Sequence, residues 1–198
     1  MGKVGKYSNW WNRATCAVFS AALGFALLLT AVFVRAGTAA APTEYQLKAV
    51  FLMNFAKFVE WPASAFRSAQ SPITICVLGD DPFGHDLDDV VRDQMAGDRS
   101  LAVRRLAQVH REETCHVLFL GSSEKDRAER ILGALKNAPM LTVSDGDEFT
   151  AAGGMIGFLI EDNKIRFEIN LDAAERAGLK ISSKLLKLAK NVREKRKS

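Results

Sequence analysis

The first 41 residues constrain this chain most, because they separate a short leader from the part that can fold. The start is basic and has no acidic residue, with Lys3, Lys6 and Arg13. An unbroken run of apolar and small residues follows over 17–34, and small residues fill positions 36–41. This order is typical of a secretory signal peptide. We therefore expect residues 1–41 to be a signal peptide that is cleaved within 36–41.

The same run supports a second interpretation. About 18 apolar residues are close to the shortest length that can span a bilayer. An uncleaved amino-terminal anchor is therefore the alternative to a cleaved signal peptide. In both cases the remaining chain works outside the cytoplasm.

The charge of the remaining chain is balanced in total but uneven in place. After the leader there are 23 basic and 23 acidic residues. The 157 residues that remain are enough for one domain with a core of its own. Residues 180–198 hold eight basic residues and one acid, so residues 42–179 hold 15 basic and 22 acidic residues. An acidic body with a basic end does not fit a nucleic-acid binder, whose basic residues form a footprint on the fold itself.

Two cysteines, Cys76 and Cys115, remain once Cys16 leaves with the leader. An even number of cysteines in an oxidising compartment favours a disulfide. Such a bridge would close a loop of about 39 residues and constrain the unfolded chain. Two buried free thiols in apolar strands are the alternative.

Helical and strand patterns alternate along the mature chain. Thr43 and Gln46 form a capping box before a helix with a broad aromatic face, which should end near Trp61-Pro62. The other expected helices cover 82–95, 124–136 with Ser122 or Ser123 as the cap, 171–177 and 182–196. The expected strands cover 73–78, 101–106, 115–120, 140–143, 155–160 and 164–169. Asp162-Asn163 should close the last two strands into a hairpin.

This order of elements predicts the fold class. Strands that alternate with helices and finish in a hairpin indicate an α/β fold. We expect a single-domain sandwich with a mixed, mostly parallel sheet, an antiparallel hairpin at its end and helices on both faces. The domain should cover 42–190, and the basic residues 191–198 should form a disordered tail.

Common catalytic and cofactor motifs are missing from the sequence. There is no nucleophile elbow, no zinc-protease helix and no phosphate-binding loop of the Walker type. The turn over 79–84 follows a strand but lacks the glycine spacing of a dinucleotide site. The histidines, His85, His110 and His116, are scattered and form no pair on one helix face. We therefore expect no catalytic residue, no metal site and no cofactor, which leaves binding as the means of action.

Several segments together resemble one known family. They are EYQLKAVFLMNFAKFVEWP at 44–62, ICVLGDDPFG at 75–84, CHVLF at 115–119, GGMI at 153–156, RFEIN at 166–170 and AGLKISSKLL at 177–186. In this order they are similar to the YfiR family and cover most of residues 44–190.

The resemblance implies a function. It implies a non-enzymatic periplasmic protein that binds and represses the periplasmic sensory domain of an inner-membrane diguanylate cyclase, and so lowers cyclic-di-GMP and biofilm formation. It further implies a homodimer, and an outer-membrane lipoprotein that can sequester the repressor. Cys76 and Cys115 match a disulfide pair of the family. A second family pair, just before Gly153-Gly154, has no counterpart here.

The resemblance also points to the closing hairpin as the partner-binding region. Alternation along the second hairpin strand places Arg166, Glu168 and Asn170 on one polar face. With Ile156 and Lys180, these residues are the expected partner contacts. The alternative function is a periplasmic small-ligand binding module that feeds another membrane receptor, such as a sensor kinase. Its pocket would lie against the aromatic face of the first helix, with Phe58 and Trp61 at the rim.

Overall fold

The computed structural model describes residues 41–194. The predicted signal peptide and the last four residues lie outside this part of the chain, except for Ala41. The helices are α2 (Glu44–Phe58), α3 (His85–Val91), α4 (Ala128–Ala134), α5 (Leu171–Arg176) and α6 (Ser183–Leu188), with short 3-10 helices η1 (Ala63–Ala65) and η2 (Ser122–Arg127). Among the described residues, no helix is both long enough and apolar enough to cross a bilayer.

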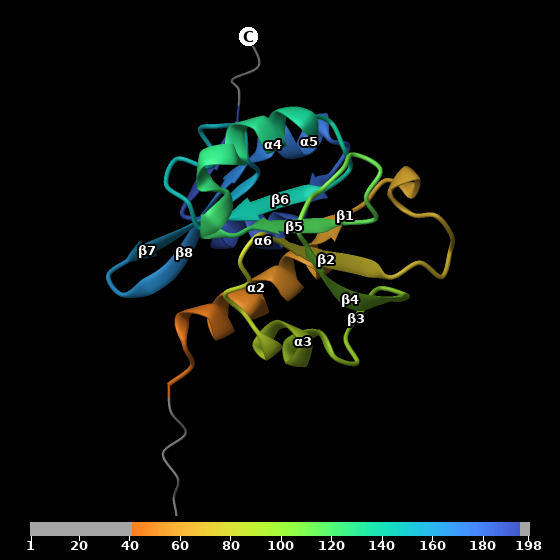
Figure 1. The fold of residues 1–198 in the computed structure, drawn as a ribbon, viewed down its shortest axis with the longest axis horizontal. Helices are drawn as coiled ribbons and strands as arrows, with labels where there is room; N and C mark the ends of the chain where they lie inside the picture. The colour runs from red at the N-terminus through yellow and green to blue at the C-terminus, as the bar shows by residue number, and fades with distance from the viewer. Residues whose placement is uncertain (1–40, 195–198) are drawn as a thin grey trace, which may run out of the picture. The chain divides into compact units, whose positions relative to one another are not determined.

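The main sheet is mixed and mostly parallel, as the sequence predicts (Figure 1). Its strand order is β10-β8-β7-β6-β5-β2-β4-β3. These strands are β10 (Asn191–Arg193), β8 (Lys164–Asn170), β7 (Ile156–Glu161), β6 (Leu141–Ser144), β5 (Val117–Leu120), β2 (Ile73–Leu78), β4 (Arg99–Leu106) and β3 (Met95–Ala96). Only β7–β8 and β3–β4 are antiparallel neighbours in this sheet of the described chain. A separate two-stranded sheet joins β1 (Val59–Glu60) to β9 (Lys180–Ile181).

Two apolar clusters fill the two faces of the sheet. Alternation along β2 sends Ile75 and Val77 to one cluster and Cys76 and Leu78 to the other. Helices α2 and α3 pack on the first cluster, and α4 packs on the second. The predicted α/β sandwich with helices on both faces is therefore confirmed.

The first helix begins as its sequence predicts. The Thr43 hydroxyl accepts a hydrogen bond from the Gln46 backbone N–H at 3.2 Å, and the Gln46 side chain accepts one from the Thr43 N–H at 2.9 Å. On the buried side, Phe55 packs against Phe158 and Phe167 with ring centroids 5.7 and 5.2 Å apart. These ring contacts fix α2 over the β7–β8 hairpin.

The hairpin turn also follows the prediction. Asp162 and Asn163 have φ angles of 49° and 56°, the left-handed conformation that two-residue hairpin turns require. Aspartate and asparagine tolerate this region better than most residues. The turn therefore sets the register in which Glu161 lies opposite Lys164.

Three helix predictions differ from the structure. The helix expected over 82–95 covers only His85–Val91, and Met95 begins strand β3. The segment 124–136 is not one helix, because its first residues belong to the 3-10 helix η2, and neither η2 nor α4 has a side-chain cap. The Ser123 hydroxyl accepts a hydrogen bond from the Asp80 backbone N–H at 2.9 Å. This bond ties the loop after β5 to the loop after β2 instead of capping a helix.

The end of the chain differs as well. The helix expected over 182–196 ends at Leu188, and Asn191–Arg193 form β10, parallel to β8. Ala189 is extended, and the Lys190 N–H donates to the Phe167 carbonyl at 2.8 Å. Strand pairing therefore continues the fold past residue 190, where the sequence predicts a disordered tail.

Candidate functional site

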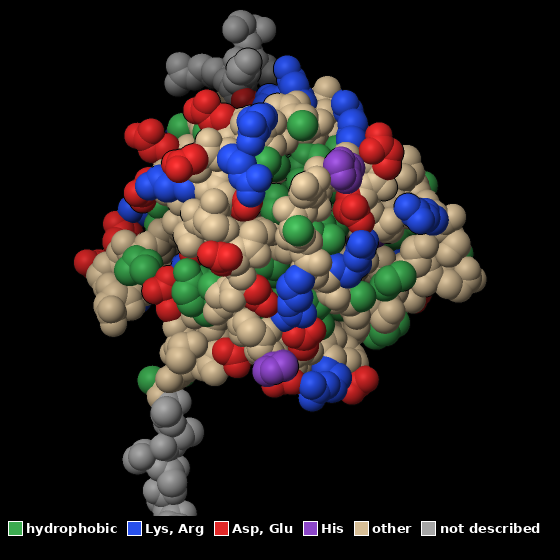
Figure 2. Space-filling model, viewed as in Figure 1, with side chains coloured by type: hydrophobic (Ala, Val, Ile, Leu, Met, Phe, Trp, Pro, Cys, Tyr) green, Lys and Arg blue, Asp and Glu red, His purple; other side chains and the backbone are tan. Residues whose placement is uncertain are grey.

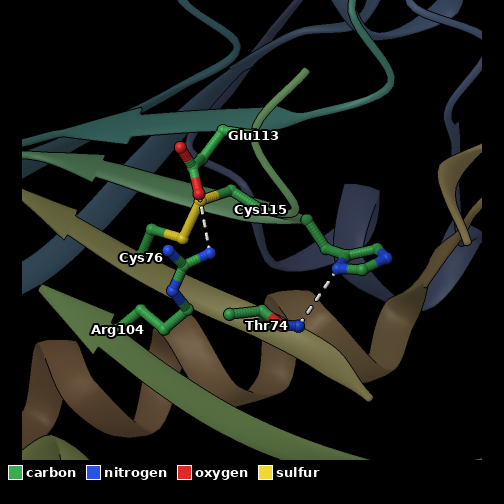
Figure 3. Close-up of a disulfide and its surroundings, with 6 residues drawn as sticks. Thr74, Cys76, Arg104, Glu113 and Cys115 are labelled. Carbon is green, nitrogen blue, oxygen red and sulfur yellow. Dashed lines mark hydrogen bonds and ion pairs between the residues drawn. A yellow bond between two sulfur atoms is a disulfide. The ribbon is translucent and has the colours of Figure 1, made fainter. Parts of the chain in front are cut away.

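The predicted disulfide joins Cys76 in β2 to Cys115, just before β5, with Cα atoms 5.9 Å apart. Both cysteines are buried in the second apolar cluster. Figure 3 shows the ion pair between Arg104 and Glu113 beside the bridge, with Nη1 and Oε1 2.7 Å apart. The bridge is thus a closed structural element, because a reactive cysteine needs access to solvent.

His116 follows Cys115 and is fully buried. Its Nδ1 accepts a hydrogen bond from the Thr74 backbone N–H at 3.1 Å (Figure 3). One face of the ring stacks on Phe66 at a centroid distance of 4.6 Å, and Trp61 meets it edge-on at 5.5 Å. Burial lowers the pKa of His116 to about 4. The histidine is therefore a neutral part of the core near pH 7.

The carboxyl ends of β2 and β5 are where a nucleotide would bind in a doubly wound fold. Here the two loops pack directly on each other. A Cβ on Gly121 would lie 2.5 Å from the Asp80 carbonyl oxygen, so only glycine fits there. Arg105 binds Asp81 at 2.9 Å and Asp88 at 2.6 Å, and these contacts hold the loop over 79–84 against β4 and α3. The hydrogen bond to Arg105 also lowers the pKa of Asp88. The packed loops after β2 and β5 therefore fill the place where a nucleotide would bind.

The carboxyl end of β6 is different, because buried charge gathers there. Lys48 of α2 is 2% exposed, and its Nζ lies 2.5 Å from Glu44 and 2.9 Å from Asp145. Nζ also lies 4.5 Å from the centroid of the Tyr45 ring, a cation–π contact. The Tyr45 hydroxyl donates to Asp145 at 2.9 Å. Burial first, and then this hydrogen bond, raises the pKa of Tyr45 to about 12.

A cavity of about 520 Å³ also borders the turn after β6. Its walls come from that turn, from the end of β5 and from the start of α4. Apolar groups such as Phe149 and Ala128 share the lining with Glu124, Glu129 and further acids. This volume suits a small organic molecule, and the lining favours a cationic one.

The structure separates the five expected partner contacts. Ile156 lies in the core, and Asn170 is a buried helix cap whose Oδ1 accepts from the Ala173 N–H at 3.1 Å. Glu168 is half-buried and accepts a hydrogen bond from the Thr150 hydroxyl. Of the five, Arg166 and Lys180 are exposed, and Lys180 lies in the small β1–β9 sheet away from the hairpin strands.

The expected pocket rim is also split. Phe58 and Trp61 are both half-buried near the β1–β9 sheet. Trp61 lines a cavity of about 230 Å³ with Phe66 and Arg99, whereas Phe58 is not part of its lining. The indole Nε1 of Trp61 is buried without a hydrogen-bond partner. Within residues 41–194, no group of three or more His, Cys, Asp or Glu side chains is placed to hold a metal ion.

Sequence reasoning missed the Lys48 cluster. The spacing of Glu44 and Lys48 on a helix was a usable signal, because residues four apart lie on one face. Nothing in the local sequence indicates that Lys48 pairs with Asp145, which is 97 residues further along the chain. Only the fold brings the two together.

This fold and these sites define a small disulfide-bonded α/β domain that offers surfaces and modest cavities. The chain belongs to the YfiR/HmsC-like family, whose model matches residues 45–190. Among solved structures it is similar to the crystal structure of a conserved domain protein from Vibrio cholerae O1 biovar El Tor strain N16961. The identity is 11% and the TM-score is 0.49, over 76% of this chain and 60% of that one. The chain thus spans about three fifths of that protein's length.

Proposed function

We propose that this protein is a periplasmic regulator that binds the periplasmic sensory domain of an inner-membrane diguanylate cyclase and represses it, so that cyclic-di-GMP stays low. The observation that carries the proposal is the family match over residues 45–190. A repressor of this kind favours the inactive state of its receptor, and its effect is limited by its differential affinity for the two receptor states.

Export is part of the proposal. The disulfide between Cys76 and Cys115 supports an oxidising compartment, because such bonds are rare where thiols are kept reduced. Amino-terminal sequencing of the periplasmic protein should find a start within 37–42. A mature protein that retains Met1 would instead indicate the uncleaved anchor. A homodimer and sequestration by an outer-membrane lipoprotein complete the proposal.

Deletion of the gene tests the repression. Cyclic-di-GMP and surface attachment should rise in the deletion strain, and the restored gene should reverse both. Unchanged cyclic-di-GMP, under conditions where the protein is made, would contradict the proposal.

A charge reversal tests the hairpin as the contact region. Glu168 is a poor choice, because its bond to Thr150 would be lost together with any partner contact. Arg166→Glu changes an exposed side chain in the same strand and should weaken repression at unchanged protein level. Arg130→Glu, an exposed arginine on α4, is the matched control and should repress normally. Equal repression by both variants would remove the hairpin from the interface.

The cavity beside the turn after β6 supports a second candidate function. A small-ligand binding module that feeds another receptor, such as a sensor kinase, would use this space of about 520 Å³. Native mass spectrometry of protein from periplasmic extracts tests it. A bound small molecule that is lost in an Ala128→Trp variant would favour this candidate.

A further inference from the structure

The β7–β8 hairpin leaves one strand edge uncovered. Strand β6 ends at Ser144 and pairs with β7 only through Ile156 and Gly157. Strand β7 continues to Glu161, and within residues 41–194 no strand lies beside its last four residues on the β6 side. A free edge of this kind can pair with an added strand.

The backbone of β7 points its hydrogen-bonding groups toward this edge. The Phe167 carbonyl accepts from the Lys190 N–H, so the backbone groups of Phe167 face away from β7. Phe158 lies opposite Phe167 and therefore directs its own N–H and C=O away from β8. Two residues on, the alternation gives Ile160 the same direction. Ile160 thus offers a donor and an acceptor to an incoming chain.

A cavity of about 350 Å³ lies beside the edge, where β6 would run if it continued. Phe158, Leu159 and Ile160 form one wall, and the other walls come from Glu44, Lys48, Asp145 and Asp147. Three carboxylates thus face one ammonium group. That ammonium is already bound to Glu44 and Asp145, so the space favours a positive charge.

The edge also carries exposed apolar surface. Ile160 is 61% exposed, a large value for a β-branched side chain in a strand. Figure 2 shows hydrophobic and acidic side chains next to each other at the hairpin end of the visible face. A single exposed apolar side chain is common on protein surfaces, but here it stands beside an unpaired strand edge and a charged cavity, which gives an added strand an apolar contact.

We propose that the open edge of β7 binds an extended segment of a partner protein as an added strand. The segment pairs with the backbone of Ile160, places a lysine or arginine against Glu44 and Asp147, and packs an apolar side chain on Ile160. This proposal rests on the proposed function in one respect, because in both the protein acts by binding another protein.

The probe is the peptide acetyl-Lys-Val-Lys-Val-Lys-amide, titrated into ¹⁵N-labelled mature protein. Binding should shift the amide signals of β7 and slow hydrogen exchange at Ile160. It should weaken several-fold as salt rises from low to physiological strength. The peptide acetyl-Glu-Val-Glu-Val-Glu-amide should not bind.

Two variants separate backbone pairing from charge. Ile160→Pro removes the outward N–H and leaves the β7–β8 ladder bonds in place, so the lysine peptide should bind about three- to tenfold more weakly. Asp147→Lys should weaken it by about tenfold or more, because like charges then face each other. Asp126→Lys, an exposed acid on η2, is the matched control and should bind as the wild type does.

Several results would overturn the proposal. One is failure of the lysine peptide to bind, and another is equally good binding of both peptides. Others are amide shifts that map outside β7, and an Asp147→Lys variant that binds the lysine peptide as tightly as the wild type does. Peptide-free protein that forms a dimer through this edge would also overturn it, because a second copy would then be the occupant. Cyclic-di-GMP in the deletion strain is measured separately, so the edge and the proposed function can fail independently.

Discussion

The two ends of the central strands are built differently. At the amino end of β5, Cys115 is bridged to Cys76, and His116 is bonded to Thr74 and stacked on Phe66. At the carboxyl end of β6, charged groups and cavities gather around Asp145, and the β7 edge continues without a neighbour. The disulfide and buried apolar contacts stabilise the first end, whereas the second places charged side chains beside cavities. Changes at the first end should therefore act on stability alone, whereas changes at the second should also act on binding.

Loss of the disulfide should have the largest effect. The bridge closes a loop of 39 residues, so its removal should lower the free energy of unfolding by about 4 kcal/mol in the chain-entropy model. In a domain of this size that corresponds to roughly 8–16 °C in Tm. Thermal unfolding of the double variant Cys76→Ala/Cys115→Ala measures the loss.

Wild-type protein that is reduced in denaturant and refolded in reductant is the control for that variant, because the folded chain buries both cysteines. It should lose a similar amount of stability, and peptide binding at the β7 edge should be unchanged in the folded state. An unchanged Tm on reduction would show that the bridge does not hold the amino end together.

Acid should weaken the same end through His116. Its folded pKa of about 4 lies below the unfolded value near 6.5, so between these pH values the unfolded chain binds a proton that the folded chain does not. Stability is therefore lost as pH falls through this window, by up to about 3 kcal/mol. Urea unfolding at several pH values measures the slope.

Two matched variants separate the contribution of His116 to the pH dependence of stability from the contribution of the carboxylates. His116→Gln should be less stable at pH 7, because the stack on Phe66 is lost, but should depend less on pH between 6.5 and 4. His110→Gln, an exposed histidine, should keep the wild-type slope. The same slope in both variants would contradict the role of His116.

Local patterns explain why much of the fold follows from the sequence. Apolar runs such as Ile73–Leu78 bury both faces, and the capping box and the Asp162-Asn163 turn act within a few residues. The C-terminal strand β10 could not be predicted, because Asn191–Arg193 are exposed and gain their conformation only by pairing with β8. The clusters around His116 and Asp145 join residues far apart in the chain, so composition and spacing do not reveal them.

At the second end, removal of a buried charge should affect stability and binding in opposite directions. Lys48→Met leaves Asp145 without its ammonium partner and should cost about 2 kcal/mol of stability. The cavity beside β7 then gains net negative charge, so the lysine peptide should bind more tightly. Urea unfolding and the peptide titration measure the two effects.

The double variant Lys48→Met/Asp145→Asn is the matched test of that coupling. It should recover part of the stability, because neither charge is then left unpaired. Stability that falls further in the double variant would mean that the two side chains do not act as a pair.

The smallest effect concerns Tyr45, which reports on the cluster directly. The sequence has two tyrosines, and Tyr7 lies in the predicted signal peptide, so a mature chain that starts after residue 41 has Tyr45 alone. Its ultraviolet titration should give a pKa of about 12. The unfolded chain ionises near 10, so Tyr45 stabilises the fold at neutral pH, and this contribution is lost as pH rises from 10 toward 12.

Asp145→Asn should lower the pKa of Tyr45 while keeping it above 10, because burial is the larger cause of the shift and remains. Asp147→Asn changes an acid in the same turn and should leave the titration as in the wild type. Circular dichroism at each pH confirms that the chain is still folded while the phenol titrates. A wild-type pKa near 10 in folded protein would show that the Tyr45–Asp145 contact is open to solvent. The carboxyl end of β6 would then lack the buried polar cluster that distinguishes it from the amino end of β5.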